Sequence, residues 1–431
     1  MTSTTAVRDA LERAHRRSWG RLVGAIFRRF GDLHGAEDAV AAAFESAATA
    51  WTAGLPDEPE AWLRVTARNH LVSALRRSAH ESPTGDDAVL DRASERDDER
   101  TDAISDDELD PRVGLLLVCA HPAIDARLHA PLMMQVVLGI DAARIAPMFL
   151  TSPATLGQRL ARGKAKIRDA GIRFAHPSAD QRAGRVGAAL AAIYAAYGVG
   201  DGAEGEVRDR AHDLRTEAIR LAHEVAASFP ANAEAHGLLA LLCYSEGRRG
   251  GRDVDRFVPL DQHDTTRWSA AWRARGDEAL DRASALIATG VDRPGRYQLE
   301  AAISAVHSAR ADTGATDWGA IRELYTVLIA TAPSAGAVVA AAGAALHDGD
   351  TGAARSLLDA LPADVVRDYQ PYWVCRAAVL RSERADDGSR VVAEREAAAR
   401  QRAIGLTTDP AVRAYLLQQQ QPLRADAVSR R

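Results

Sequence analysis

The stretch DAARIAPMFLTSPATLGQRLARGKAKI, residues 141–167, decides how this chain is interpreted. Gly139 can end a preceding helix in a left-handed conformation. Asp141 can cap a short helix over residues 142–149, and after a tight turn Ser152 can cap a longer helix that has a proline at its first position. Two helices joined by a turn of about three residues form a helix-turn-helix.

The longer helix separates an apolar face from a polar face. Its apolar residues recur at spacings of four, three and four, which predicts a buried stripe made of Leu156, Leu160, Gly163 and Ile167. Arg can bond guanine and Gln can bond adenine through two hydrogen bonds each, and Lys neutralises phosphate. The residues predicted to contact duplex DNA are Ser152, Thr155, Gln158, Arg159, Arg162, Lys164 and Lys166. A basic amphipathic helix on the outside of a bundle fits the pattern equally well.

Three more amphipathic helices are predicted upstream, within residues 7–80. The last of them, residues 60–77, carries cations and aromatic rings, the combination that binds single-stranded DNA. Its candidate DNA-binding residues are Trp62, Arg64, Arg68, Asn69, His70, Arg76 and Arg77. By pattern alone the alternative is favoured, in which Trp62 anchors a core and the arginines form a solvated face.

The rest of the chain divides by composition. Residues 81–110 are rich in Asp and Glu and poor in apolar side chains, which predicts a flexible acidic linker. Residues 111–175 are helical and contain the helix-turn-helix. Residues 183–420 read as successive helices separated by Gly, Pro and Asp signals, with a loosely tetratricopeptide-like spacing of small residues. The whole chain is therefore predicted to be all-α.

Composition excludes several classes of protein. The N-terminus lacks the apolar segment of a signal peptide and no apolar run nears ~20 residues, so we expect a cytoplasmic protein without membrane partners. The three cysteines are far apart, which indicates reduced, buried thiols. Asp261, His263 and Asp264 are interpreted as a capping and loop network with Arg267 and Trp268 rather than a metal site. No phosphate loop, zinc motif or nucleophile motif is present, so we expect no enzyme, catalytic residue, metal or cofactor.

Two segments, in this order, resemble the extracytoplasmic-function sigma factors of bacterial RNA polymerase. Region 2 is matched by WGRLVGAI from Trp19, GDLHGAEDAVAAAFESA from Gly31 and PEAWLRVTARNHLVSALRR from Pro59. Region 4 is matched by CAHPAI from Cys119 and PATLGQRLARGKAKIRDAGIRF from Pro153. The remainder, including LDQHDTTRW from Leu260 and TDWGAIRELY from Thr316, looks like the helical extension of one subgroup.

The resemblance implies a role for each segment. Residues 7–80 would be region 2, whose second helix contacts core RNA polymerase through Glu37, Asp38 and Phe44. The helix from Pro59 would hold the melted −10 element, and the helix from Pro153 would read the −35 element of promoter DNA. The C-terminal domain would regulate these modules in cis or bind a protein partner.

The chain also departs from the family pattern. Ala41 and Ala42 stand where a Gln-Glu pair is usual, and Pro147 lies inside the first helix of the helix-turn-helix, where it should kink that helix. Two other functions therefore remain open. One is a helix-turn-helix regulator that acts without polymerase, and the other is a helical-repeat scaffold for protein interactions.

Overall fold

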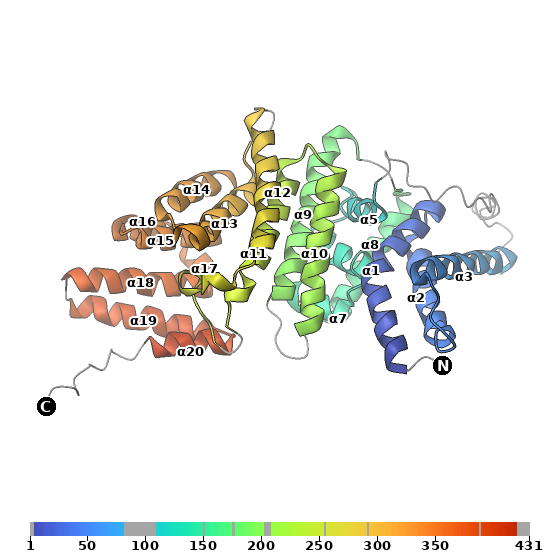
Figure 1. Cartoon of the computed structure of the whole chain (residues 1–431), viewed down its shortest axis with the longest axis horizontal. Helices are drawn as coiled ribbons and strands as arrows, with labels where there is room; N and C mark the ends of the chain where they lie inside the picture. Colours follow the sequence, from blue (N-terminus) through green and yellow to red (C-terminus); the bar gives the residue numbers. More distant parts are fainter. Residues whose placement is uncertain are drawn as a thin grey trace. The chain divides into compact units, whose positions relative to one another are not determined.

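The computed structural model describes residues 4–81, 109–149, 151–174, 177–201, 208–253, 256–290, 293–387 and 389–419. Within these residues every regular element is an α-helix or a 3-10 helix, which confirms the predicted all-α class (Figure 1). The predicted acidic linker, residues 81–110, lies outside the described residues except at its two ends. The chain divides into two compact units, Met1–Pro230 and Ala231–Arg431.

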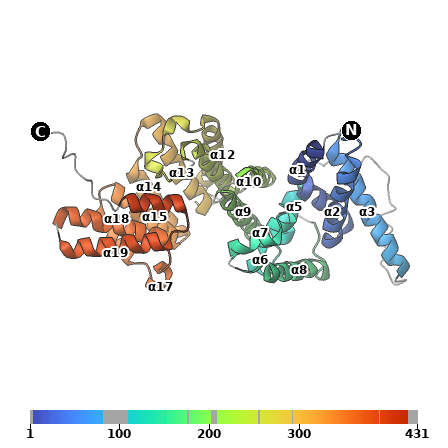
Figure 2. The same ribbon diagram turned by 90° about the horizontal axis from the view of Figure 1, so that it is seen from below.

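The first unit begins with a three-helix bundle: α1 (Thr4–Phe30), α2 (Leu33–Ala50) and α3 (Pro59–Glu81). α1 buries an apolar face made of Leu22, Val23, Ile26 and Phe27. Trp51 and Leu63 complete the core at 1% and 0% exposure. The later turns of α3 extend beyond α1 and α2 (Figure 2).

Four helical segments follow in the first unit: α5 (Pro111–Cys119), α6 (Ala126–Val136), α7 (Ala142–Ile145) and α8 (Pro153–Asp169). Gly139 has a φ of 63°, as predicted for a residue that ends a helix in the left-handed region. Asp141 caps α7 by accepting a 2.6 Å hydrogen bond from the Ala143 N–H. The predicted helix 142–149 changes to a 3-10 helix, η2, at Ala146–Phe149. Pro147 explains the change, because it has no N–H to donate.

A hairpin of two long helices completes the first unit: α9 (Ala179–Asp201) and α10 (Arg208–Ser228). It packs on α5 and α6. Arg185 of α9 is 6% exposed, and its guanidinium donates two hydrogen bonds, of 3.0 and 2.6 Å, to the Leu117 carbonyl of α5. The division of the chain at Pro230 therefore differs from the predicted start of the C-terminal domain at residue 183.

The second unit is a succession of helices in which neighbours along the chain pack together. They are α11 (Ala233–Gly247), α12 (Ala270–Ala288), α13 (Arg296–Thr313), α14 (Trp318–Thr331), α15 (Ala335–His347), α16 (Thr351–Asp359), α17 (Ala363–Val366), α18 (Gln370–Asp387), α19 (Arg390–Leu406) and α20 (Pro410–Gln418). Glycines separate several of these helices, as the sequence signals predicted: Gly314 lies between α13 and α14, and Gly349 lies between α15 and α16. Contacts between nearest neighbours are typical of helical solenoids.

Two expectations from composition can be compared with the described residues. No described helix is both long and apolar enough to cross a membrane. Cys119 and Cys243 are buried, as predicted, and burial raises the pKa of each thiol. Cys375 is only half-buried, and none of the three cysteines forms a disulfide.

Candidate nucleic-acid interface

The cap of α8 determines where the helix begins, and the spacing of its apolar residues determines which side is buried. Ser152 Oγ accepts a 3.2 Å hydrogen bond from the Thr155 N–H, and Pro153 occupies the first helical turn. The predicted stripe is buried throughout: Leu156, Leu160, Gly163 and Ile167. Burial of this stripe fixes the rotation of the helix and leaves its polar face toward solvent.

That polar face carries nearly all the residues predicted to contact duplex DNA. The exposed members are Ser152, Thr155, Gln158, Arg159, Arg162 and Lys166. We call these six residues the α8 face. Exposed Arg and Gln side chains on one helix can reach base edges, and the neighbouring Lys can reach phosphate.

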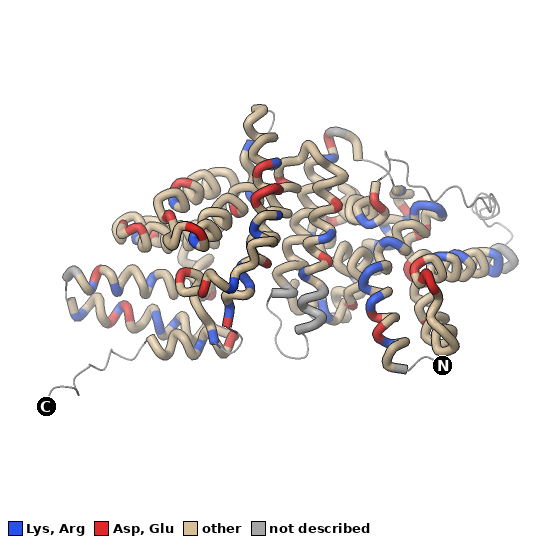
Figure 3. Tube along the Cα trace, viewed as in Figure 1, with Lys and Arg blue, Asp and Glu red and all other residues tan. Residues whose placement is uncertain are grey.

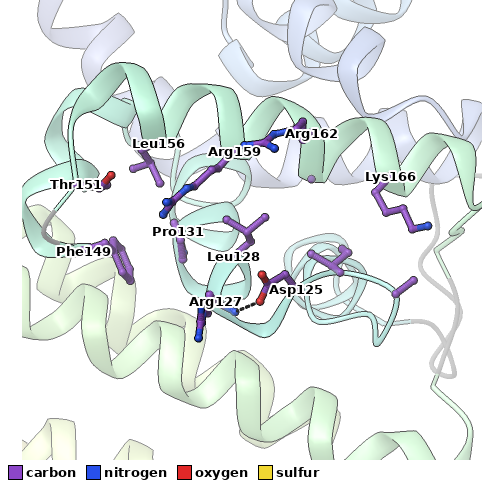
Figure 4. Close-up of a pocket in the computed structure, with 13 residues that line it drawn as sticks. Asp125, Arg127, Leu128, Pro131, Phe149, Thr151, Leu156, Arg159, Arg162 and Lys166 are labelled. Carbon is purple, nitrogen blue, oxygen red and sulfur yellow. Dashed lines mark hydrogen bonds between the residues drawn. The ribbon is translucent and has the colours of Figure 1, made fainter.

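A hollow of about 360 Å³ lies beside the α8 face, between α8 and the start of α6. Arg159, Arg162 and Lys166 line it from α8, and Arg127 lines it from α6 (Figure 4). The Asp125 carboxylate also lines the hollow and accepts a 3.0 Å hydrogen bond from the Arg127 N–H, which caps α6. Four cations around one carboxylate suit a phosphate group. Sequence reasoning missed Arg127, although the Asp125 cap signals a helix start there.

Lys164 is the member of the predicted set that does not face solvent. Its Nζ donates a 2.9 Å hydrogen bond to Oε1 of Glu37 on α2, and its side chain is 19% exposed. Glu37 is 8% exposed, and burial raises the pKa of its carboxyl group while Lys164 opposes that shift. The structure therefore joins one residue predicted to bind DNA to one predicted to bind polymerase.

The other two residues predicted to contact polymerase lie differently. Asp38 is exposed, and its Oδ2 lies 3.5 Å from Nδ1 of exposed His34. Phe44 is half-buried, with its ring centroid 5.1 Å from that of His15 and 6.4 Å from that of Trp19. Asp38 is thus accessible to a partner, and Phe44 contributes mainly to packing between α1 and α2.

The second predicted DNA surface lies on α3. Arginines recur along this helix (Figure 3). Arg64, Asn69, Arg76 and Arg77 are exposed, while Arg68 is half-buried. Val65, beside Arg64, is an exposed apolar side chain at 54%. We call the four exposed polar residues and Val65 the α3 surface.

The two rings predicted to stack on bases are partly used inside the bundle. Trp62 is half-buried and meets Trp51 edge-on, with ring centroids 5.9 Å apart. His70 is half-buried, and its Nε2 lies 3.0 Å from Ser46 Oγ. These contacts fit the alternative of Trp62 as a core anchor, and each ring leaves only part of its surface for a ligand.

The 261–268 loop forms a hydrogen-bonding network. Asp264 Oδ1 caps a 3-10 turn by accepting a 3.0 Å hydrogen bond from the Thr266 N–H. The carbonyls of Asp261 and His263 both accept hydrogen bonds from Arg310, a partner that the sequence did not indicate. Across the residues that the structure describes, no cluster of His, Cys, Asp and Glu could hold a metal ion.

Comparison with known proteins gives a family without a described activity. Residues 185–284, from α9 to α12, match a family of unknown function (DUF6596). The uncharacterized protein R00370 of Rhizobium meliloti (strain 1021) is 34% identical over 316 residues, which cover 72% of this chain and 74% of that protein. No solved structure matches the chain.

The structure gives the class of this protein, and the likeness to the Rhizobium meliloti protein gives its family. It is an all-α protein with an exposed cationic helix and a long helical C-terminal part. The chain belongs to the same family as the Rhizobium meliloti protein.

Proposed function

We propose that this chain is a transcription initiation factor of the extracytoplasmic-function sigma type, which binds core RNA polymerase and directs it to −35/−10 promoters. The α8 face carries the proposal. Its residues are exposed on a capped helix that follows a short helix and a turn, and the opposite side of α8 is buried. In this helix-turn-helix arrangement, the second helix enters the major groove.

The α3 surface supports the second DNA contact. In region 2 of the proposed factor, α3 would hold the melted −10 strand. Arg64, Arg76 and Arg77 supply cations for the phosphates, and the exposed part of Trp62 supplies a stacking edge. Asp38 offers an exposed carboxylate for polymerase on the adjacent helix α2.

The second unit would then be a regulatory domain. Its helices pack mainly on their nearest neighbours, an arrangement used by tetratricopeptide-like proteins to present extended surfaces to partners. The proposal assigns no chemical step and no cofactor to any part of the chain.

Run-off transcription tests the function directly. Core polymerase is combined with the full chain and genomic fragments, and transcripts that depend on the chain are expected. Replacing Arg159 and Arg162 by Ala should abolish them, whereas Arg390→Ala, on a side chain that is 92% exposed in the second unit, should not. No chain-dependent transcript on any fragment would overturn the proposal.

One observation favours a second function. Glu37 is paired with Lys164, so this predicted polymerase contact is engaged within the chain. A helix-turn-helix regulator that binds duplex DNA without polymerase would need no contact at Glu37. Co-purification with core polymerase discriminates the two functions, because only the initiation factor requires it.

A further inference from the structure

The two proposed DNA-binding modules pack directly against each other in the first unit. We call them the α1–α3 module and the α5–α8 module. Two glycines of α1 allow the close approach. A Cβ on Gly24 would lie 2.5 Å from the carbonyl oxygen of Pro111, and a Cβ on Gly20 would overlap the carbonyl oxygen of Val137. Trp19 Nε1 donates a 3.1 Å hydrogen bond to the Val136 carbonyl. The contact is thus shaped at the level of the backbone.

An ion pair also joins the two modules across this interface. The Lys164–Glu37 ion pair joins α8 to α2, and both side chains are largely withdrawn from water. A pair of this kind is costly to break from one side, because the remaining charge stays buried. The interface therefore uses Lys164 and Glu37, two residues that the proposed function would need elsewhere.

Hydrogen bonds join the α9–α10 hairpin to the α5–α8 module. Arg112 of α5 is 3% exposed; its Nη1 donates a 2.5 Å hydrogen bond to Glu217 of α10, and its Nη2 donates to Glu224. Arg185 of α9 adds its two bonds to the Leu117 carbonyl. If the interface opens, the hairpin should move with α5–α8.

The packed modules are too close together to occupy both promoter elements. The −35 and −10 elements lie about 25 base pairs apart, on the order of 80 Å at about 3.4 Å per pair. Arg159 is five residues from Lys164, and Ser46, which contacts His70, is nine residues from Glu37. At 1.5 Å per residue these steps are about 8 and 14 Å. With side chains added, the distance from Arg159 on the α8 face to Asn69 on the α3 surface, the residue next to His70, is at most on the order of 40 Å.

The segment that connects the modules is long enough for them to separate. Residues 82–108 lie between the last residue of α3 and Leu109. A chain of that length reaches on the order of 90 Å at about 3.3–3.6 Å per residue. The length of the connecting segment therefore does not keep the modules together. The noncovalent contacts of the interface do.

We propose that this packing is an autoinhibited conformation, in which the α5–α8 module must leave the α1–α3 module before the chain can span a promoter. The inference rests on the proposed function. This autoinhibited conformation is stabilised by the Gly20 and Gly24 contacts and by the Lys164–Glu37 ion pair. Opening frees Glu37 for polymerase and Lys164 for DNA in one step.

A glycine substitution tests the interface without touching any residue assigned to DNA or polymerase. Gly24→Leu places a side chain where Pro111 stands, so it should force the modules apart. Gly184→Leu is the matched control, because a Cβ at this exposed helical glycine meets nothing within 4 Å. Dyes attached at Ser73→Cys on α3 and Ala161→Cys on α8, in a Cys375→Ser background, report the separation by energy transfer.

Transfer efficiency should fall in Gly24→Leu and stay unchanged in Gly184→Leu, with helix content equal in both. In the unlabelled proteins, Gly24→Leu should raise chain-dependent run-off transcripts several-fold. Equal transfer in the two variants, or a fall without any rise in transcripts, would overturn autoinhibition.

A second variant covers the case in which Gly24→Leu fails to fold. Lys164→Glu repels Glu37 and should lower energy transfer, whereas Lys166→Glu makes the same charge change on an exposed residue of α8 and should not. If neither wild type nor variants yield transcripts, the proposed function fails. If wild type transcribes and neither Gly24→Leu nor Lys164→Glu changes the energy transfer, only the autoinhibition fails.

Discussion

The helices α8 and α3 are both rich in arginine, yet the fold uses them differently. In α8 the stripe of Leu156, Leu160, Gly163 and Ile167 is buried, and the predicted DNA-contacting residues are exposed, except Lys164. In α3 the arginines reach solvent, but Trp62 and His70 are shared with the bundle through Trp51 and Ser46. A strict separation of faces therefore predicts the environment of a side chain, whereas a mixture of aromatic and cationic residues does not.

The two helices also differ in what supports them. The α5–α8 module relies on the α9–α10 hairpin through Arg112 and Arg185, both nearly fully buried. The core of the α1–α3 module consists mainly of its own residues, such as Phe27, Trp51 and Leu63. Removing the hairpin should therefore damage one region and spare the other.

The largest expected effect comes from truncation. A chain that ends at Arg182 loses α9 and α10, so amide exchange in α5–α8 should approach that of an unfolded chain while α1–α3 stays protected. A chain that ends at Pro230 is the control, and its α5–α8 amides should keep their protection. Equal protection of α5–α8 in both chains would show that the hairpin is not needed.

Arg112→Ala sharpens the same contrast with one residue. It leaves half-buried Glu217 and Glu224 without the Arg112 guanidinium, and Glu217 keeps only its contact with Arg220 of those two arginines. Breaking a buried ion pair from one side costs about 3–5 kcal/mol. Urea unfolding of the first unit measures this cost. Arg127→Ala, on an exposed side chain of α6, should change the unfolding free energy by less than about 0.5 kcal/mol.

DNA-binding affinities should distinguish the α8 face from the α3 surface, with the next largest effect. Arg159→Ala or Arg162→Ala should weaken binding to a −35 duplex by about 1–3 kcal/mol and relax its sequence preference. Arg76→Ala and Arg77→Ala should weaken single-strand binding and its salt dependence while leaving the duplex preference intact. Fluorescence anisotropy measures the affinity for duplex and for single-stranded DNA. If the α8 or the α3 substitutions weakened both affinities equally, the two surfaces would not have different DNA targets.

The smallest effect concerns the stability of α8 itself. Gly157 has no atom near its missing Cβ, so Gly157→Ala should stabilise the protein by about 1 kcal/mol through helix propensity. Gly163→Ala should act in the same direction, because its Cβ would meet Leu128 and Leu132 at an ordinary 3.8 Å. A lower unfolding midpoint for both variants would mean that the helix is strained by a contact the structure does not contain.

Much of the fold could be predicted because local signals decide it. Caps at Asp141 and Ser152, the left-handed Gly139 and the α8 stripe all depend on residues within one helix or at its ends. The predicted breaks between helices in the second unit follow Gly and Pro for the same reason.

The remaining features depend on residues that are far apart in sequence. Nothing near Lys164 indicates Glu37, which is 127 positions away, and nothing near Arg112 indicates Glu224, which is 112 positions away. Such pairs form only when helices are already packed. The same reason explains why Arg127 was missed and why the chain divides at Pro230 rather than near residue 183.

Footprinting of core polymerase on a chain-dependent promoter tests the central claim most directly. With the wild-type chain, two protected segments are expected upstream of the start site, about 25 base pairs apart, on the order of 80 Å along B-DNA. Arg159→Ala should lose the upstream segment and Arg76→Ala with Arg77→Ala the downstream one. A footprint identical with and without the chain would contradict the account.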